Sequence, residues 1–184
     1  LKILITFLIF AESIINITIT IKNLLFLKSY LEKKELKGIK TLHVSSAQEM
    51  QDQLAVQFPT CEILLMAAAV ADAKPSAPSL EKIKKADYKS ITLEANPDLL
   101  ANLSKIKKPK QVLVAFAAET SKIDKATIDI AISKMTNKGA DMIYLNDVSE
   151  GAIFGSSETS GLLIDNNGET VEVNNKSKDT LADL

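Results

Sequence analysis

The sequence predicts an α/β fold: a Rossmann-like, doubly wound and mostly parallel sheet with helices on both faces and a C-terminal antiparallel hairpin. Short continuous apolar runs such as residues 62–69 are typical of strands buried in a parallel sheet. Amphipathic helical stretches alternate with these runs, as they do in βαβ units. Near the C-terminus, Asn167-Gly168 separates two strand-like segments, which is typical of a hairpin turn.

Composition and charge limit the classes of function. A chain of 184 residues fits a single domain, so we expect residues 1–184 to form one unit. A hydrophobic fraction of 46% and a net charge of −1 exclude a disordered tail and a basic nucleic-acid arm. We therefore expect no nucleic-acid partner.

The residue types present also limit the kind of site. All 22 cationic side chains are lysines, so an anion site must use ammonium groups, backbone N–H groups and helix N-termini. The single cysteine and single histidine, Cys61 and His43, exclude an intramolecular disulfide and clusters of these metal ligands. Because only Gly38 precedes Gly139, a glycine-rich phosphate loop near the N-terminus is excluded.

Residues 3–11 form an apolar run preceded by Lys2, which fits either a signal peptide or a buried strand. β-Branched residues favour the strand, and the run is shorter than the ~20 residues that a membrane-spanning helix needs. We expect a strand, a cytoplasmic protein and no membrane partner. The chain begins with Leu1 rather than Met, so we expect a piece of a longer or processed product.

The next elements follow from periodicity and capping. Alternating apolar residues predict a strand over 15–21, and the leucines after them predict a helix over 23–37 that ends at Gly38. A short strand is expected over 39–44. The capping box of Ser46 and Glu49 then predicts a helix to about Phe58, with Met50, Leu54 and Val56 buried.

The central strand 62–69 precedes a loop over 70–79 and a further strand over 90–95. We expect Asn96 to be the N-cap of the next helix, with Pro97 at its first position and Asp98 in its first turn. This helix should end in the lysine-rich run 105–110, which we interpret as surface. The leucines that it should bury are Leu99, Leu100 and Leu103.

The C-terminal half is expected to contain a buried strand over 112–117 and a helix over 124–138 closed by Gly139. A strand over 142–145 ends at Asn146-Asp147, and the hairpin covers 162–173.

Ligands of open α/β sheets bind outside the carboxyl ends of the strands. The segments at those positions are 68–72, 116–120 and 146–147, joined by the helix start 96–98. Lys82, Lys84 and Lys85 lie on a nearby loop, and the i, i+4 spacing of Lys134 and Lys138 places both on one helical face. Carboxylates and lysines together suit a phosphate ester with a divalent cation.

Each feature also has a purely structural interpretation. Asp72 and Asp147 can simply terminate strands, and Lys134 and Lys138 can form a solvated helix face. The residues alone therefore predict a nucleotide- or phosphate-binding α/β domain. A nicotinamide-dependent Rossmann enzyme is disfavoured because no early G-x-G-x-x-G is present.

The segment Met66-Ala67-Ala68-Ala69-Val70-Ala71-Asp72 resembles the signature of the phosphopantothenate–cysteine ligases, also called phosphopantothenoylcysteine synthetases. In bacteria this family usually forms the C-terminal half of a bifunctional flavoprotein of coenzyme A biosynthesis. Further motifs follow in the family's order: the lysine-rich flap 81–85, the helix start 96–98, Phe-Ala-Ala-Glu-Thr at 116–120, Lys134, Lys138, Asn-Asp at 146–147 and Phe-Gly-Ser at 154–156.

The resemblance implies a reaction in which CTP activates the carboxylate of phosphopantothenate as an acyl-cytidylate. The amine of cysteine then displaces the nucleoside monophosphate and forms phosphopantothenoylcysteine. The implied co-substrate is CTP, and the implied metal ion is magnesium. We assign no protein ligands to the magnesium ion. A homodimer is expected, either fused to or associated with a phosphopantothenoylcysteine decarboxylase domain.

The resemblance also implies roles for individual residues. Lys82 and Asn96 are expected to act in catalysis, with Lys82 closing over the reacting carboxylate on the flap and excluding water. Asp72 and Phe116 are expected to hold the cytidine, and Lys134 and Lys138 the phosphates. The complete set of expected nucleotide-binding residues is Met66, Ala67, Ala68, Asp72, Lys82, Pro97, Asp98, Leu99, Leu100, Phe116, Lys134 and Lys138.

Residues 1–38 do not carry the resemblance. The family has a Gly-Gly-Thr-x-Glu loop after its first strand and then an Arg-x-Ile-x-Asn-x-Ser-x-Gly segment whose Asn contacts the acyl group. Here Phe7 to Phe10 replace the loop, Thr18 stands where Arg is expected, and Asn23 is a shifted counterpart of that Asn. Two hypotheses follow: an active ligase with a divergent N-terminus, or a nucleotide-binding remnant or non-catalytic subunit of the same family.

Overall fold

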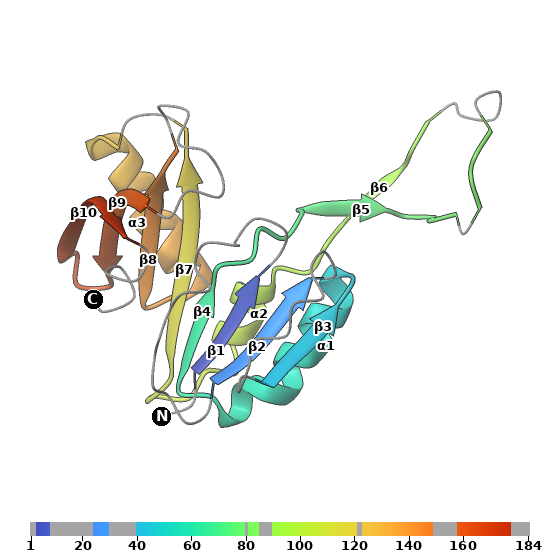
Figure 1. The fold of residues 1–184 in the computed structure, drawn as a ribbon, viewed down its shortest axis with the longest axis horizontal. Coiled ribbons are helices and arrows are strands. Elements are labelled where there is room, and N and C mark those ends of the chain that lie inside the picture. The colour runs from blue at the N-terminus through green and yellow to red at the C-terminus, as the bar shows by residue number, and fades with distance from the viewer. Residues whose placement is uncertain are drawn as a thin grey trace.

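The computed structural model describes residues 3–7, 24–29, 40–79, 81–84, 90–120, 123–148 and 158–177. Its main feature is an eight-stranded sheet of order β10-β9-β8-β7-β4-β1-β2-β3 (Figure 1). The six strands from β3 to β8 in that order are mutually parallel. Strand β9 pairs antiparallel with β8, and β10 pairs antiparallel with β9 at the edge of the sheet. The predicted α/β class is therefore confirmed, including the C-terminal hairpin.

The bounds of the elements are as follows. The strands of the main sheet are β1 (Ile3–Phe7), β2 (Leu24–Ser29), β3 (Lys40–Val44), β4 (Ile63–Met66), β7 (Val112–Glu119), β8 (Met142–Asp147), β9 (Glu158–Asp165) and β10 (Thr170–Ser177). The helices are α1 (Ala47–Gln57), a 3-10 turn η1 (Phe58–Thr60), α2 (Leu99–Ser104) and α3 (Lys125–Lys138). A separate ribbon consists of β5 (Ala73–Pro75) and β6 (Leu93–Ala95).

The strand order reverses between β1 and β4, because the chain runs outward through β2 and β3 and then returns to the other side of β1. In open α/β sheets such a reversal leaves a crevice at the carboxyl ends of the two strands, where ligands bind. The segment that leaves β4 at this point is 67–72, so the topology places the predicted signature at the crevice.

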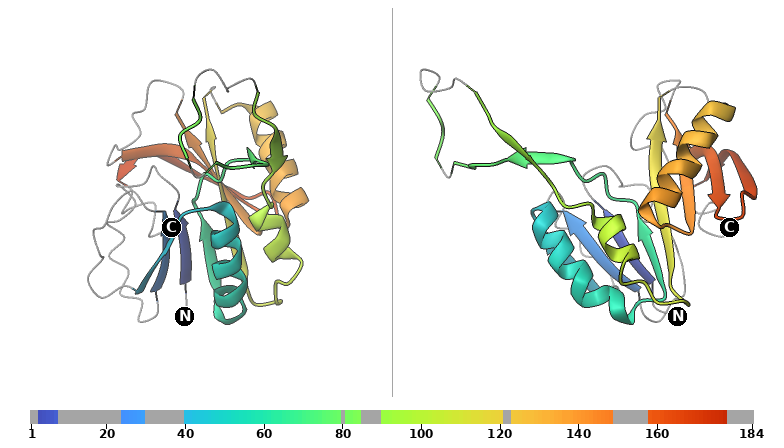
Figure 2. Two further views of the ribbon diagram at one scale, coloured as in Figure 1. Left: turned by 90° about the vertical axis from the view of Figure 1, so that its right-hand side faces the viewer. Right: turned by 180° about the vertical axis from the view of Figure 1, so that it is seen from behind.

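The three helices form one row on one face of the sheet (Figure 2). Their apolar sides meet β4, β7 and β8 in a core where Met50, Leu54, Leu64, Leu113 and Leu145 are 0% exposed. Complete burial of one such side chain stabilises the fold by roughly 1.5–3 kcal/mol. The expectation of helices on the other face concerns stretches outside the described residues.

The prediction of a helix over 23–37 is wrong for residues 24–29, which form strand β2. This strand pairs in parallel with β1 on one side and β3 on the other. The leucine-rich run has helical spacing, but a short apolar run also suits a central parallel strand, and tertiary pairing decided the outcome. Strand β1 confirms the expected strand over its described part, whereas the strand expected over 15–21 lies outside the described residues.

Helix α1 begins as predicted. The Ser46 hydroxyl is its N-cap and accepts a hydrogen bond from the Glu49 N–H at 3.1 Å, while the Glu49 carboxylate accepts one from the Ser45 N–H at 2.7 Å. Burial of Met50 and Leu54 is confirmed, but that of Val56 is wrong, because Val56 is 68% exposed. Two residues beyond Leu54, its side chain points to the opposite side of the helix.

The start of α2 differs from the prediction. Its N-cap is Asp98, whose Oδ1 accepts a hydrogen bond from the Ala101 N–H at 3.1 Å, and not Asn96. Asn96 is not at the cap position because α2 begins at Leu99, three residues later, and the Asn96 Nδ2 donates instead to the Ala71 carbonyl. Pro97 consequently precedes the cap. The predicted burial of Leu99, Leu100 and Leu103 is confirmed.

Helix α3 matches its prediction at both ends. The Asp124 carboxylate caps its start by accepting from the Thr127 N–H at 2.8 Å. Gly139 ends it in the left-handed conformation with φ 64°, and a Cβ at this residue would lie 2.7 Å from Ser104 Cβ. Both facts require glycine at this position.

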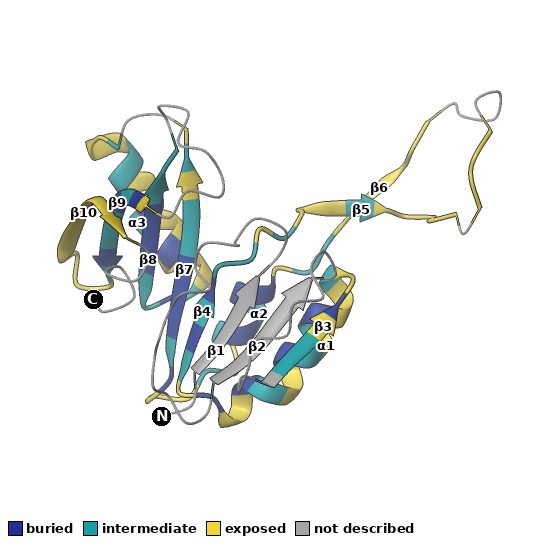
Figure 3. Ribbon diagram, in the orientation of Figure 1, coloured by how far each residue is buried: buried dark blue, intermediate teal, exposed yellow. Residues whose placement is uncertain are grey.

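The stretch between β4 and α2 is an arm that projects from the body of the protein (Figure 1). Strands β5 and β6 pair antiparallel along it, with Lys74 and Glu94 forming an ion pair at 3.4 Å. Almost all of its described residues are exposed (Figure 3). The loop expected over 70–79 thus contains β5, and only residues 93–95 of the strand expected over 90–95 are strand.

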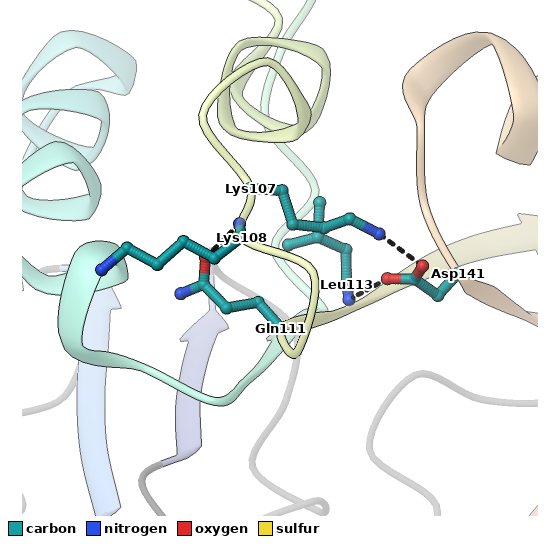
Figure 4. Close-up of polar contacts among 5 residues, drawn as sticks. All are labelled: Lys107, Lys108, Gln111, Leu113 and Asp141. Carbon is teal, nitrogen blue, oxygen red and sulfur yellow. Dashed lines mark hydrogen bonds and ion pairs between the residues drawn. The ribbon is translucent and has the colours of Figure 1, made fainter.

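The lysine-rich run 105–110, interpreted above as surface, is partly structural (Figure 4). Lys107 forms a half-buried ion pair with Asp141, whose Oδ2 also accepts a hydrogen bond from the Leu113 N–H at 2.8 Å. The Lys108 ammonium group donates to the Pro59 carbonyl at 2.8 Å. The Asp141 contacts join the amino ends of β7 and β8, so the surface interpretation is wrong for Lys107. Lys108 is exposed, so the interpretation is confirmed there.

Among the described residues, no helix combines the length and the apolar character needed to cross a membrane.

Candidate functional site

The candidate site lies at the carboxyl ends of β4, β7 and β8, which are neighbours in the sheet. Met66 at the end of β4 pairs with Ala115, and Glu119 at the end of β7 pairs with Asp147 at the end of β8. The three predicted strand-end segments therefore lie along one edge of the sheet.

Asn96 joins the signature segment to the start of α2. Its backbone N–H donates to the Asp72 carbonyl at 2.8 Å, and its Nδ2 donates to the Ala71 carbonyl at 2.8 Å. Its Oδ1 is buried and has no hydrogen-bond partner among the described residues. These two bonds bring the predicted residues Asp72 and Asp98 to the same part of the molecule. The expected catalytic role of Asn96 stays a prediction.

Lys138 brings the end of α3 to the same place. Its ammonium group lies 3.4 Å from Asp98 Oδ2, while Asp98 Oδ1 caps α2. Both side chains are about half exposed, at 46% each. An exposed pair of this kind contributes only about 0–1 kcal/mol to stability, so both groups are available to a charged ligand.

Lys134 is paired in a similar way, one helical turn earlier. Its ammonium group lies 3.7 Å from Glu119 Oε1 at the end of β7, and it is 53% exposed. The two lysines therefore do not form the plain solvated face that spacing alone allows. Each is directed towards a carboxylate at the candidate site.

Phe116 lies on the other face of the sheet. It is three residues from Glu119 on one strand, so the two side chains point to opposite faces. Its ring meets the Tyr144 ring edge-on, with centroids 6.0 Å apart and planes at 65°. The structure thus does not bring Phe116 and Lys134 onto one face; they share only the carboxyl edge.

A polar chain that sequence reasoning missed lies beside Phe116. The Tyr144 hydroxyl is 2.9 Å from Thr159 Oγ1. The Thr159 hydroxyl donates in turn to Asn146 Oδ1 at 2.9 Å. Burial raises the pKa of Tyr144 above its ordinary value of 10.0. The missed signal was the alternation of Thr159, Gly161 and Leu163, which extends β9 four residues before the predicted start at 162.

Gly161 makes room for this chain. A Cβ at residue 161 would lie 2.1 Å from the Leu145 carbonyl oxygen and 2.8 Å from the Tyr144 hydroxyl oxygen. Only glycine therefore permits the Tyr144 hydroxyl to reach Thr159.

The remaining predicted residues are distributed unevenly. Met66, Leu99 and Leu100 are buried at 8%, 3% and 6% exposure, so they can offer backbone rather than side chains. Ala67, Ala68 and Pro97 are half-buried and Asp72 is exposed. Lys82 is exposed on the projecting arm, and no contact among the described residues joins it to the strand ends.

The described residues hold no group of three or more His, Cys, Asp or Glu side chains that could bind a metal ion.

Residues 23–184 match the family described as DNA/pantothenate metabolism flavoprotein C-terminal domain. The chain is 34% identical over 152 residues to the coenzyme A biosynthesis bifunctional protein CoaBC of Mycobacterium tuberculosis H37Rv. That alignment covers 79% of this chain and 36% of the relative, so the chain spans little more than a third of the relative's length.

Two solved structures share the fold. One is the C-terminal domain of a CoaBC protein, with a TM-score of 0.74 and 23% identity, covering 99% of this chain and 90% of that one. The other is a mutant of Cab2 in complex with phosphopantothenate-cysteine, with a TM-score of 0.62 and 12% identity, covering 98% of this chain and 83% of that one.

Proposed function

Because the chain belongs to the family of DNA/pantothenate metabolism flavoprotein C-terminal domains, we propose that it is a CTP-dependent phosphopantothenate–cysteine ligase of coenzyme A biosynthesis. The observation that carries the proposal is the pairing of two lysines with two carboxylates at the carboxyl edge of the sheet: Lys138 with Asp98 and Lys134 with Glu119. The phosphates of a nucleoside triphosphate can replace these carboxylates as partners of the two ammonium groups.

The nucleotide lies across the carboxyl edge in this proposal. Its phosphates meet Lys134 and Lys138 on the helix face, and its base lies against Phe116 on the other face. The half-buried alanines that follow β4 let the ribose approach the backbone closely, because they carry no long side chain. Asp72 contributes a carboxylate for the cytidine at the exposed end of the same segment.

The chemistry proceeds in two balanced steps. The carboxylate of phosphopantothenate attacks the α-phosphorus of CTP, which forms the acyl-cytidylate and releases pyrophosphate. The amine of cysteine then attacks the acyl carbon, and CMP leaves as the amide forms and the amine loses a proton. Lysine ammonium groups stabilise the charge that collects on the phosphates in the first step.

Lys82 approaches the reacting carboxylate when the arm closes. Lys82 lies between β5 and β6, and the arm formed by these strands projects from the body of the protein, so its role requires a movement of the arm (Figure 1). Closure of such a segment excludes water, which would otherwise hydrolyse the acyl-cytidylate.

Magnesium would enter with the triphosphate. The carboxylates that we propose to hold it are those of Glu119 and Asp147, which are paired in register at the ends of β7 and β8. Two carboxylates with phosphate oxygens and water are the donor set that this ion accepts. Bound there, magnesium would neutralise phosphate charge.

The wider context proposed for the chain follows its relatives. We propose a cytoplasmic homodimer that acts together with a phosphopantothenoylcysteine decarboxylase domain. The relative in Mycobacterium tuberculosis is named a bifunctional protein of coenzyme A biosynthesis. The small-molecule substrates are phosphopantothenate and cysteine.

A second candidate function is a nucleotide-binding remnant or non-catalytic subunit of the same family. The observation that favours it is the absence of glycine before Gly38, where the family carries its glycine-rich loop. A protein of this kind would bind CTP but would not activate the acyl group.

One assay separates the two. The chain is incubated with CTP, magnesium, phosphopantothenate and cysteine, and release of pyrophosphate and formation of the amide are measured. Pyrophosphate that depends on phosphopantothenate supports the ligase, whereas CTP binding without pyrophosphate supports the remnant. Asp72→Ala should weaken CTP binding in either case, and an unchanged affinity would remove Asp72 from the site. Absence of any nucleotide binding by the unaltered chain contradicts both functions.

A further inference from the structure

Three side chains form a directional hydrogen-bond chain at the end of β8. Tyr144 and Thr159 are buried, at 3% and 8% exposure, and their oxygens are 2.9 Å apart. Because Thr159 donates its only hydroxyl proton to Asn146 Oδ1, it can only accept from Tyr144. The proton order therefore runs from Tyr144 through Thr159 to Asn146.

This order fixes the orientation of the Asn146 amide. Its oxygen is committed to Thr159, so its Nδ2 points away from the chain with both of its protons. Among the residues that the structure describes, Nδ2 has no hydrogen-bond partner. Asn146 is half-buried, so a bound ligand can reach this donor.

The oriented donor is a neighbour of Phe116. Asn146 pairs with Ala118 in the ladder, and Phe116 lies two residues before Ala118 on the same face. The spacing of strands and residues places the Phe116 and Asn146 Cβ atoms about 8 Å apart, which is the span of one aromatic base. Tyr144 lies between them, with its ring against Phe116 and its hydroxyl at the head of the chain.

We propose that Tyr144 and Thr159 are positioning residues that aim the Asn146 amide at the base of the bound nucleotide, where Nδ2 donates a hydrogen bond to a ring acceptor. The proposal rests on the proposed function, because it takes the base to lie against Phe116. Cytosine presents N3 and the O2 carbonyl as acceptors, and Nδ2 is a donor of matching chemistry. A donor held in place loses no rotational freedom on binding, so its contribution to selectivity is larger.

Thr159→Val tests the proposal, because valine has nearly the same shape but cannot donate to Asn146. We expect CTP to bind about ten-fold more weakly to this variant, the usual cost of one misdirected hydrogen bond. Thr159→Ser, which keeps the hydroxyl, should restore most of the affinity. Inorganic tripolyphosphate, which has no base, should bind equally to the unaltered protein and to both variants. Calorimetry measures all of these affinities.

A double-variant comparison separates positioning from general stability. If Thr159 acts through Asn146, Thr159→Val should cause no further loss of CTP affinity in an Asn146→Ala background. Additive losses, or a parallel loss of tripolyphosphate binding, would show a merely structural role and overturn the proposal. Full CTP affinity in Thr159→Val would also overturn it while leaving the proposed function intact. If the unaltered protein binds tripolyphosphate but not CTP, the proposed function fails first.

Discussion

Lys138 Nζ lies 3.4 Å from Asp98 Oδ2, so the last turn of α3 is tied electrostatically to the residue that caps α2. The two oxygens of one carboxylate have different partners here, since Oδ1 accepts from the backbone N–H of Ala101 and Oδ2 faces the ammonium group. A ligand that binds the Lys138 ammonium group can therefore leave the capping bond from the Ala101 N–H to Asp98 Oδ1 in place.

Removal of the Lys138 ammonium group should therefore weaken ligand binding and have little effect on stability. We expect Lys138→Ala to weaken CTP binding by about ten-fold, the loss of one charge-assisted contact, with a change in unfolding free energy below about 1 kcal/mol. Isothermal calorimetry and urea denaturation measure the two quantities. Asp98→Asn is the matched control, because asparagine also caps helices but leaves Lys138 unpaired. Unchanged CTP affinity in Lys138→Ala would contradict the phosphate role.

Substitution of Lys82 should lower turnover without changing the stability of the fold. Since it is exposed on the arm, Lys82→Ala should leave the thermal midpoint unchanged. We expect kcat to fall by about 100-fold, as when one preorganised donor is lost from an active site. Lys84→Ala, an exposed lysine of the same segment, is the control and should have a smaller effect. Turnover of Lys82→Ala equal to that of the unaltered chain would remove Lys82 from the mechanism.

Asp141 should matter for stability rather than for catalysis, because it lies at the opposite end of β7 and β8. Asp141→Asn loses the ion pair with Lys107, because its single amide oxygen cannot accept from both Lys107 and the Leu113 N–H. We expect unfolding free energy to drop by about 1–3 kcal/mol. Asp129→Asn, on the exposed side of α3, should change it by less than about 0.5 kcal/mol. Equal effects of the two substitutions would refute the structural role of Asp141.

The capping contacts of Asp124 predict how the stability of the protein changes at low pH. Its hydrogen bonds from the Thr127 backbone and hydroxyl hold its pKa below the ordinary 3.8. The carboxylate therefore stabilises α3 fully above pH 3.8, and this contribution is lost as the pH falls through the lower folded-state pKa. Asp124→Asn caps the helix without titrating, so its urea midpoint should fall less between neutral pH and pH about 3 than that of the unaltered chain. A parallel fall in both proteins would contradict this origin.

Local signals in the sequence were sufficient where they agreed with the tertiary structure. Helix α3 has an Asp cap, helical periodicity and a terminal glycine, and all three are observed. Strand β2 was missed because leucines spaced for a helix also fill a short central strand, and only pairing with β1 and β3 distinguishes the two.

The cap of α2 shows a second kind of limit. Asn96 and Asp98 are both good N-caps by residue type, and residue type alone does not show that α2 begins at Leu99, which places Asp98 at the cap. Asn96 instead contacts Ala71, 25 residues earlier. The Tyr144–Thr159–Asn146 chain was likewise invisible, because it depends on the register between β8 and β9. Strand-end motifs located the candidate site, but the face on which each side chain lies required coordinates.

The pairing of Lys134 and Lys138 with carboxylates has a consequence for discrimination among anions. Each ammonium group already faces a carboxylate, so a singly charged anion such as chloride meets little net positive charge there. An anion that carries several charges in a row can contact both ammonium groups at once, and exposed ion pairs cost little to break. We therefore expect polyanions to bind here more tightly than small singly charged anions.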